Sequence, residues 1–216
     1  MKILRHDEIL SLLASDSVVP VSQLAKRLYV SEATIRRDLA EMDKLGLIRR
    51  THGGALRARD TSKESSFASR EADHLIQKKT ISALAASHLE DNSVLFMDSG
   101  STLLPLAKML DRFSHLSVVT HGIRTALVLS GLKNIKVFVA GGMIENFSNS
   151  ILGSPVSEFY AGMNADVAIM TCSGIDANGN ITDDDLDQAK IKQMMISRSK
   201  SVYLLCDSSK FNKTRM

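Results

Sequence analysis

Cysteine is scarce in this 216-residue chain, and long hydrophobic runs are missing. The two cysteines, Cys172 and Cys206, lie in separate apolar, strand-like runs, which excludes the dense disulfide framework of small secreted domains. No apolar run approaches the roughly 18 residues of a membrane-spanning helix. The first residues, MKILRHDEIL, place charges where a signal peptide would be apolar. We therefore expect a cytoplasmic protein without a membrane partner.

Metal-binding motifs are also missing, because the six histidines are scattered and neither cysteine has a neighbour of the ligand type. The sequence implies no metal and no cofactor. Hydrophobic residues make up 44% of the chain and charged residues 24%, which is typical of a globular protein with a substantial core.

Positive charge is concentrated near the N-terminus. Residues 1–79 contain 15 Lys and Arg against 11 Asp and Glu, a net charge of +4, whereas residues 80–216 contain 12 against 13, a net charge of −1. This asymmetry indicates a polyanion partner for the first part of the chain.

The first 57 residues read as three short helices followed by a hairpin. Ser22 is predicted to cap the second helix and Ser31 the third, because a serine hydroxyl accepts a hydrogen bond from the first turn. Gly46 follows the third helix, at a position where glycine commonly ends one. Two extended runs around Gly53-Gly54 predict a small β-hairpin.

The third helix has two chemically different faces. Ile35, Leu39 and Met42 share one face, which we expect to pack on the two preceding helices. The opposite face combines small and basic residues: Ala33, Arg37, Ala40 and Lys44, flanked by Thr34 and Arg36. The hairpin adds further cations: Arg49, Arg50, His52 and Arg57.

Such a helix suits the major groove of DNA, where arginine pairs with guanine edges or phosphates. Two helices joined by a tight turn form a helix-turn-helix, and the basic hairpin would act as its wing. The alternative is that Arg36 and Arg37 are ordinary solvated charges, since charged residues usually lie outside. The ordered run of helices, caps and basic hairpin favours DNA binding.

From about residue 75 onward, strand-like runs alternate with helical segments, which predicts an α/β domain with a mostly parallel sheet covered on both faces. The expected strands cover residues 93–98, 116–120, 135–140, 166–171 and 201–207. The expected helices cover residues 75–90, 102–111, 122–130 and 184–199. We therefore predict an α+β DNA-binding domain over residues 1–57, a linker over 58–74 and a second domain over 75–216.

The segment FMDSGST carries the most specific chemistry of the second domain. A buried strand ends at Asp98, and a turn of polar residues leads into a helix: Ser99, Gly100, Ser101 and Thr102. Backbone N–H groups and hydroxyls around a glycine form an anion site, and Asp98 would accept hydrogen bonds from hydroxyls of the same ligand. The alternative is that these residues only form the turn and cap the helix.

Other strand ends supply further candidates, because ligands collect at the carboxyl ends of the strands in such sheets. These candidates are Thr120, His121, Gly141, Gly142 and Lys210. Turn formation explains the two glycines nearly as well, and a solvated loop explains the lysine. The acidic run of Asp183, Asp184, Asp185 and Asp187 more often marks a helix start than a catalytic base.

The run VSQLAKRLYVSEATIRRDLAEMDKLGLIRRTHGGAL resembles the N-terminal signature of the DeoR family of bacterial transcription regulators. The resemblance implies a winged helix-turn-helix whose second helix, residues 31–45, reads operator DNA. It also implies contacts from Ser31, Thr34, Arg36 and Arg37.

The segments DSGST, VVTHG, VAGG, Gly153, GIDANGNIT and DSSKF resemble the effector domain of the same family, so the resemblance covers essentially the whole chain. That domain is similar in fold to ribose-5-phosphate isomerase. The resemblance implies a phosphorylated sugar or sugar-derivative effector, whose phosphate would lie on Ser99–Thr102 with Lys210 nearby.

The sequence departs from the family pattern at several positions. The family often has threonine in place of Ser101, asparagine in place of His121 and an acidic residue in place of Gln188. Family members also usually continue for a few dozen residues beyond Met216, so we expect the effector domain to lack its C-terminal end.

We predict a DNA-binding repressor of a carbohydrate-utilisation operon, controlled by a phosphorylated sugar, without enzymatic activity. Repeated operator half-sites call for a homodimer or homotetramer. Two alternatives stay open: an enzyme like a sugar-phosphate isomerase, which needs a general base, or a regulator whose C-terminal domain only oligomerises.

Overall fold

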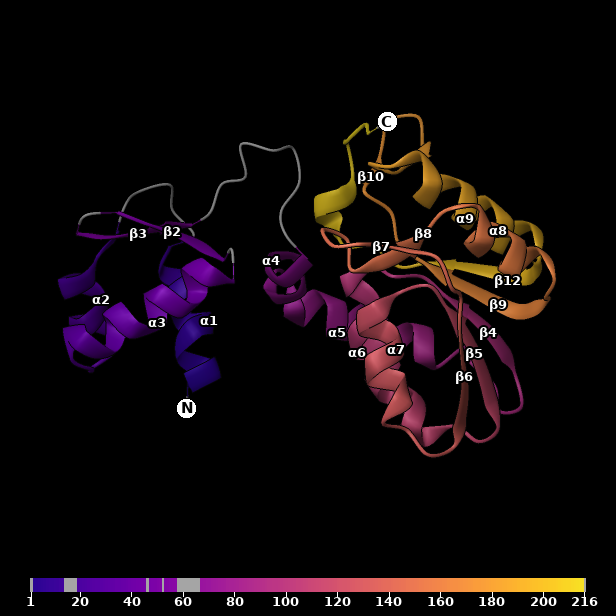
Figure 1. Cartoon of the computed structure of the whole chain (residues 1–216), viewed down its shortest axis with the longest axis horizontal. Helices are drawn as coiled ribbons and strands as arrows, with labels where there is room; N and C mark the ends of the chain where they lie inside the picture. Colours follow the sequence, from indigo (N-terminus) through magenta and orange to yellow (C-terminus); the bar gives the residue numbers. More distant parts are fainter. Residues whose placement is uncertain (1, 14–18, 46, 52, 58–66, 216) are drawn as a thin grey trace. The chain divides into compact units, whose positions relative to one another are not determined.

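The computed structural model describes residues 2–13, 19–45, 47–51, 53–57 and 67–215. The chain divides into two compact units, Met1–Asp73 and His74–Met216, which are drawn in Figure 1 and described separately below. No helix in the described ranges is both long and apolar enough to cross a membrane.

Up to Arg57, the described residues of the N-terminal unit form three helices and a small antiparallel sheet. The helices are α1 (Lys2–Leu12), α2 (Val21–Arg27) and α3 (Glu32–Lys44). The strands are β1 (Val19–Pro20), β2 (Ile48–Arg50) and β3 (Gly54–Arg57), in the order β1-β3-β2. The predicted helices and hairpin are confirmed, and the segment before α2 adds a third strand.

The predicted inner face of α3 forms the centre of this unit. Ile35, Leu39 and Met42 are at most 1% exposed and pack with residues of α1, α2 and the sheet. The predicted cap is also confirmed, because the Ser31 hydroxyl accepts a hydrogen bond from the Thr34 N–H at 3.2 Å. Gly46 lies outside the described residues.

The predicted cap at Ser22 is wrong. Helix α2 already begins at Val21, and Pro20 occupies the N-cap position with φ −62°. The first N–H group of the helix, that of Val21, instead donates to the Gly53 carbonyl at 3.0 Å.

A partly buried ion pair joins the first and third helices. The Arg5 guanidinium donates to both carboxylate oxygens of Asp38, at 2.6 and 3.1 Å. Burial alone would raise the pKa of Asp38, but the hydrogen bond and charge of Arg5 outweigh it and hold that pKa below its ordinary value. Asp38 therefore anchors α3 on its inner side as a carboxylate.

The C-terminal unit is built on five parallel strands in the order β12-β9-β4-β5-β6. These strands are β4 (Val94–Met97), β5 (Leu116–Thr120), β6 (Ile135–Val139), β9 (Ala165–Met170) and β12 (Ser199–Leu204). The predicted bounds of all five strands agree with the structure to within a few residues, and the predicted parallel sheet is confirmed.

Helices cover both faces of this sheet, as Figure 1 shows. They are α5 (Leu75–Ala86), α6 (Leu104–Met109), α7 (Ile123–Ser130), α8 (Ser154–Ala161) and α9 (Leu186–Ser197). The remaining described helix, α4 (Phe67–Ala72), belongs to the unit that ends at Asp73. Residues of α5, α6 and α7 form one apolar core with the sheet, and residues of α8 and α9 form another on the opposite face. Helix α4 lies within the segment that we predicted as a linker.

Short elements complete the unit. Two antiparallel hairpins are formed by β7 (Met143–Glu145) with β8 (Ser150–Leu152), and by β10 (Gly174–Ile175) with β11 (Ile181–Thr182). Single 3₁₀ turns are η1 (Ser101–Leu103), η2 (Leu110–Arg112) and η3 (Ser208–Lys210). Helix α8 and the β7–β8 hairpin were not predicted.

We predict that Asp38→Asn loosens α3, because the variant removes the carboxylate to which the Arg5 guanidinium donates. Amide hydrogen exchange in α3 should accelerate by roughly tenfold, the effect of losing a hydrogen bond to a charged group. Since the pKa of Asp38 is lowered by folding, its contribution is present above about pH 4 and is lost as the pH falls further. Glu32→Gln is the matched control, because its ion pair with Arg36 is exposed and contributes little. Equal exchange in the two variants would contradict the anchoring role.

Candidate functional site

The outer face of α3 presents the basic residues predicted for DNA. Arg36, Arg37 and Lys44 are exposed, on the side opposite the buried stripe. The Arg36 guanidinium donates to Glu32 at 2.8 Å, one turn earlier, whereas the hydroxyls of Ser31 and Thr34 lie 2.9 Å apart at the helix start. The pair with Glu32 is exposed and weak, so Arg36 and Arg37 are both candidates for contacting DNA.

Of the basic residues predicted in the hairpin, Arg50 is the one whose side chain the structure describes. The Arg50 side chain is exposed, and its backbone N–H donates to the Asp43 carboxylate at 3.2 Å, which ties β2 to the end of α3. His52 and the side chains of Arg49 and Arg57 lie outside the described residues.

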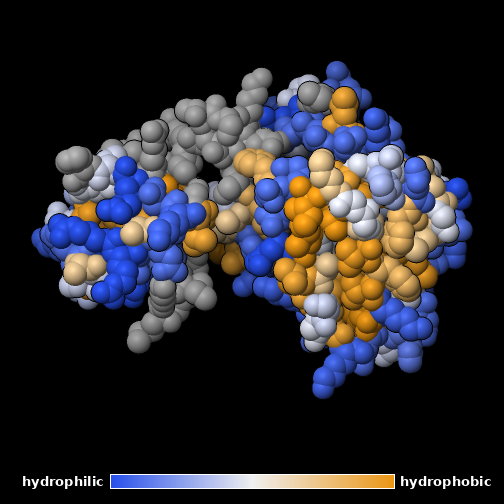
Figure 2. All heavy atoms as spheres, in the orientation of Figure 1, coloured by the Kyte–Doolittle hydropathy of each residue, from blue (hydrophilic) through white to orange (hydrophobic). Residues whose placement is uncertain are grey.

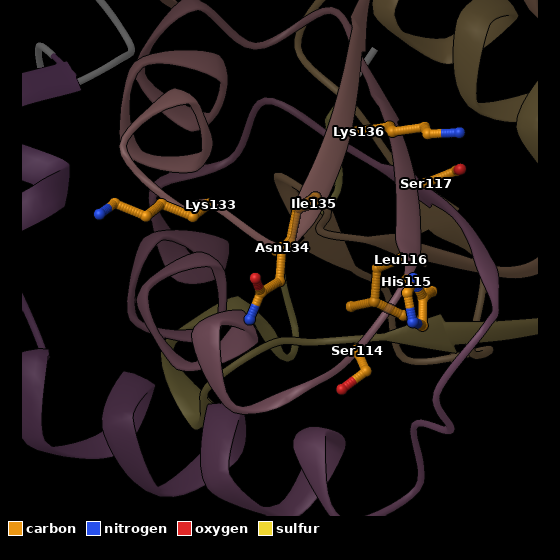
Figure 3. Close-up of a pocket in the computed structure, with 8 residues that line it drawn as sticks. All are labelled: Ser114, His115, Leu116, Ser117, Lys133, Asn134, Ile135 and Lys136. Atoms are coloured by element: carbon orange, nitrogen blue, oxygen red, sulfur yellow. The ribbon is translucent and has the colours of Figure 1, made fainter.

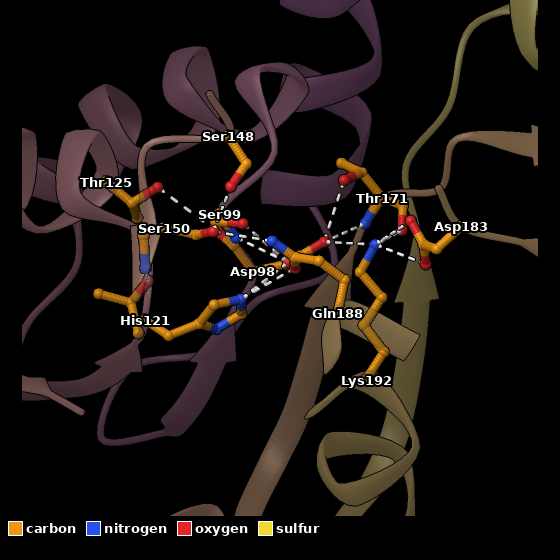
Figure 4. A network of polar contacts seen from close by, with 12 residues as sticks. Asp98, Ser99, His121, Thr125, Ser148, Ser150, Thr171, Asp183, Gln188 and Lys192 are labelled. Carbon is orange, nitrogen blue, oxygen red and sulfur yellow. Dashed lines mark hydrogen bonds and ion pairs between the residues drawn. The ribbon is translucent and has the colours of Figure 1, made fainter. Parts of the chain in front are cut away.

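In the C-terminal unit, Asp98 lies at the end of the central strand β4 and is fully buried (Figure 4). One carboxylate oxygen accepts the Ser99 N–H at 2.7 Å; the other accepts the N–H and hydroxyl of Thr171, both at 3.0 Å. Burial by itself raises the pKa of Asp98, but the Lys192 ammonium group and these N–H groups hold it below the ordinary value. Because the protein itself occupies both carboxylate oxygens, Asp98 is better suited to stabilising the site than to binding a ligand.

Lys192, from α9, is the cation that balances this carboxylate. Its ammonium group lies 3.3 Å from Asp98 and donates to both oxygens of Asp183 at 2.8 Å and to the Thr171 carbonyl at 2.9 Å. Burial would lower the pKa of Lys192, but the two carboxylates raise it above the ordinary value. The pKa of Asp183 is raised because burial exceeds the effect of Lys192. Lys192 therefore stays charged and joins α9 to the ends of two strands.

His121 follows β5 and is also fully buried in this network. Its Nδ1 lies 3.1 Å from the Tyr160 hydroxyl, and its Nε2 lies 3.4 Å from the Gln188 amide oxygen and 3.5 Å from Asp98. Burial lowers the pKa of His121, so the imidazole is neutral at pH 7. Gln188 in turn donates to the Ser150 hydroxyl at 2.8 Å. His121 and Gln188, two departures from the family pattern, thus contact each other.

The turn after Asp98 is tightly enclosed. A Cβ at Gly100 would clash with Thr171, and a Cβ at Gly122 would lie 2.7 Å from the Ser99 Cα, so the two glycines allow the turn to pack against its neighbours. Ser101 and Thr102 are buried beside α5. There the Lys78 ammonium group, itself only 4% exposed as a residue, donates to the Ser101 hydroxyl at 3.2 Å. The turn therefore combines hydroxyls with a buried cation.

The remaining predicted effector residues are less closely joined to this turn. Thr120 is buried, and its hydroxyl accepts the Gly122 N–H at 3.0 Å. Gly141 and Gly142 follow β6, where a Cβ at Gly142 would lie 2.7 Å from the Leu152 carbonyl, so close packing with β8 explains that glycine. Lys210 lies in η3, where its positive charge favours the ionised forms of Cys206 and Asp207 by acting to lower their pKa.

Sequence reasoning missed Lys192, Asp183, Thr171 and Lys78 as members of the site. Of these four, only Lys192 could have been predicted from the sequence, because Gln188, Lys192 and Met195 are spaced so that they share the inward face of α9. Within the acidic run, Asp185 does cap α9, as predicted, while Asp183 faces the network.

A separate pocket opens at the amino ends of β5 and β6 (Figure 3). It is lined by Ser114, His115, Leu116, Ser117, Lys133, Asn134, Ile135 and Lys136. Figure 3 shows the side chains of Lys133 and Lys136 pointing to opposite sides, so they do not converge on a ligand. The carboxyl ends of the strands remain the better candidate.

Comparison with known families identifies both units. The DeoR-like helix-turn-helix domain matches residues 5–61, and the DeoR C terminal sensor domain matches residues 73–216. The chain belongs to the DeoR family. It is a helix-turn-helix regulator rather than an enzyme.

Several curated proteins of this family are similar over nearly the whole chain. The HTH-type transcriptional repressor CsqR of Escherichia coli is 30% identical over 96% of this chain and 79% of its own length. The glycerol-3-phosphate regulon repressor of the same species is 31% identical over 98% of this chain and 84% of its own length. The HTH-type transcriptional regulator GolR of Listeria innocua is 31% identical over 95% and 81%.

Among solved structures, a D-ribose-5-phosphate isomerase in complex with phospho-erythronic acid is similar at 17% identity and a TM-score of 0.46. The alignment covers 63% of this chain and 54% of that one.

We predict that His121 makes the DeoR sensor unit sensitive to mild acid. Because folding lowers the pKa of His121 below its ordinary 6.5, the unfolded chain takes up the proton first. The contribution of the neutral imidazole is complete above about pH 6.5 and is lost as the pH falls towards the folded pKa, by at most about 1.4 kcal/mol per pH unit. Thermal melts of the native chain and of His121→Asn between pH 5 and 7.5 should therefore diverge below pH 6.5. Parallel profiles would show that the imidazole is not held neutral.

Proposed function

We propose that this chain is a repressor of a carbohydrate-utilisation operon in the cytoplasm. Its N-terminal unit binds operator DNA, and its C-terminal unit binds a phosphorylated sugar or sugar derivative and self-associates as a homodimer or homotetramer. The observation that carries the DNA part is the exposed basic face of α3, held outward by a buried stripe on the same helix.

Two features support a phosphorylated effector. The turn Ser99–Thr102 gathers hydroxyls at the carboxyl end of a central strand, where ligands of parallel sheets collect. Lys78 brings a buried ammonium group to the Ser101 hydroxyl, and a cation beside hydroxyls and backbone N–H groups suits a phosphate. One relative, the glycerol-3-phosphate regulon repressor, is named after a small phosphorylated polyol. We therefore assign the phosphate to this turn, with Lys78 as its cation and Lys210 as a second candidate.

The geometry gives the isomerase alternative little support. Asp98 has both oxygens engaged by Ser99, Thr171 and Lys192, and Asp183 is paired with Lys192. Neither carboxylate is placed to remove a proton from a sugar carbon.

Operator binding is tested by substitutions on α3. Arg37→Ala should weaken binding to an operator selected from a random duplex pool by about 5- to 100-fold, the effect of losing one base contact. Arg36→Ala should weaken binding by a factor in the same range, and the double variant should abolish the specific complex. Fluorescence anisotropy measures these affinities, with Arg198→Ala, an exposed arginine of the C-terminal unit, as the control. Unchanged affinity in the double variant would refute the assignment of α3.

Effector binding is tested by thermal shift with a panel of pentose and hexose phosphates and their parent sugars. A phosphorylated sugar should raise the melting temperature by mass action, while the unphosphorylated sugar should not. Lys78→Met should weaken the response by roughly 10- to 100-fold in ligand concentration, because a hydrogen bond to a charged group is lost. Lys79→Met, which removes the exposed neighbouring lysine of α5, is the matched control. Equal responses of the two variants would exclude Lys78 from the site.

A further inference from the structure

Five large apolar side chains are exposed around one edge of the C-terminal sheet. They are Leu127 on α7, Phe138 and Val139 on β6, and Met143 and Ile144 on β7, and we call them the β6 edge patch. Each is between 42% and 65% exposed. Figure 2 shows hydrophobic residues gathered over α7, β6 and the β7 hairpin.

The strand at the centre of this patch has an open edge. Strand β6 pairs with β5 on one side, and within the described ranges no strand pairs with its other side. An open edge presents N–H and C=O groups that can pair with another chain, and soluble proteins commonly protect such edges with charged residues. Lys136 is the one charged residue of β6, and residues 137–144, which follow it, carry no charged side chain. The edge is therefore suited to contact rather than to solvent.

The size of the patch also indicates an interface. At their measured exposures the five side chains present on the order of 500 Å² of surface, near the upper end of what a monomer leaves open. A stable interface of standard size buries about 800 Å² on each partner. The patch would supply more than half of that area, and the backbone of β6 and neighbouring residues would add to it.

We propose that the β6 edge patch is the surface through which the C-terminal unit pairs with a second copy of this chain, with the two β6 strands side by side about a two-fold axis. The proposal rests on the self-association in the proposed function and names its surface. A two-fold axis brings the same patch against itself, and it makes the two edge strands antiparallel, which gives a regular ladder of hydrogen bonds. The uncharged run 137–144 brings no like charges together.

A second copy is also the occupant that DNA binding requires. A helix-turn-helix protein reads two half-sites about one helical turn apart, with the symmetry of the operator matching that of the dimer. Pairing the C-terminal units of two chains supplies two copies of α3 to one operator.

The test is the mass of the full chain by sedimentation velocity, without DNA or sugar. The variant is Leu127→Glu with Met143→Glu, at two of the most exposed positions of the patch, so that the fold tolerates both charges. We expect the native chain to sediment as a dimer or tetramer and this variant at half the native mass, with association weakened at least 100-fold. Leu84→Glu with Ile196→Glu is the control, since these apolar residues are 65% and 47% exposed on α5 and α9, and it should keep the native mass.

Hydrogen exchange of the unmodified chain gives a second readout that no substitution can disturb. Amides of residues 135–145 should exchange more slowly at concentrations where the chain is associated than where it is diluted to monomers. A native chain that is monomeric throughout would overturn the self-association in the proposed function, and this proposal with it. A stable oligomer whose mass survives the two patch charges, with unchanged exchange in β6 and β7, would overturn only the surface assigned here.

Discussion

The buried carboxylate of Asp98 organises the carboxyl edge of the C-terminal sheet. A charge with no solvent exposure is stable only with compensating partners, and each partner comes from a different element. Thr171 follows β9, His121 follows β5 and Lys192 lies on α9. One negative charge at the end of the central strand thus fixes two neighbouring strands and a helix. The turn Ser99–Thr102 follows directly, so the turn proposed for the phosphate is held by the same contacts.

The N-terminal unit uses a similar device on a smaller scale. Asp38 is adjacent in sequence to Arg37, but its side chain points inward and is held by Arg5 of α1. Together with the stripe of Ile35 and Leu39, this ion pair sets the rotation of α3 about its own axis. The direction in which the basic face points is therefore decided by buried contacts on the opposite side of the same helix.

Local patterns made most of the fold predictable from the sequence. The parallel strands were predicted correctly because each is a short, continuous apolar run. Helix α3 was predicted correctly because its apolar residues recur at helical spacing. Helix α8 and the β7–β8 hairpin were missed. The loop of that hairpin, residues 146–149, contains no glycine, which is the usual sequence signal of a hairpin. Ser22 was assigned to the N-cap position, which Pro20 occupies.

The site was only half predictable, for a physical reason. Asp98 and the serine and threonine turn are adjacent in sequence, so their chemistry is visible there. The pairing of Asp98 with Lys192 joins residues far apart in the chain and exists only once α9 packs on the sheet. Asp183 was predicted, together with its acidic neighbours, to mark the start of a helix. The structure shows that only Asp185 caps α9, whereas Asp183 binds Lys192.

The most direct test of this scheme is the affinity of the chain for its operator in the presence of one sugar in two forms, phosphorylated and unphosphorylated. We predict that a phosphorylated pentose or hexose changes the operator affinity measured by fluorescence anisotropy, while the parent sugar at the same concentration leaves it unchanged. An equal response to both forms, or no response to any sugar phosphate of these classes, would contradict a sensor that recognises its effector through a phosphate.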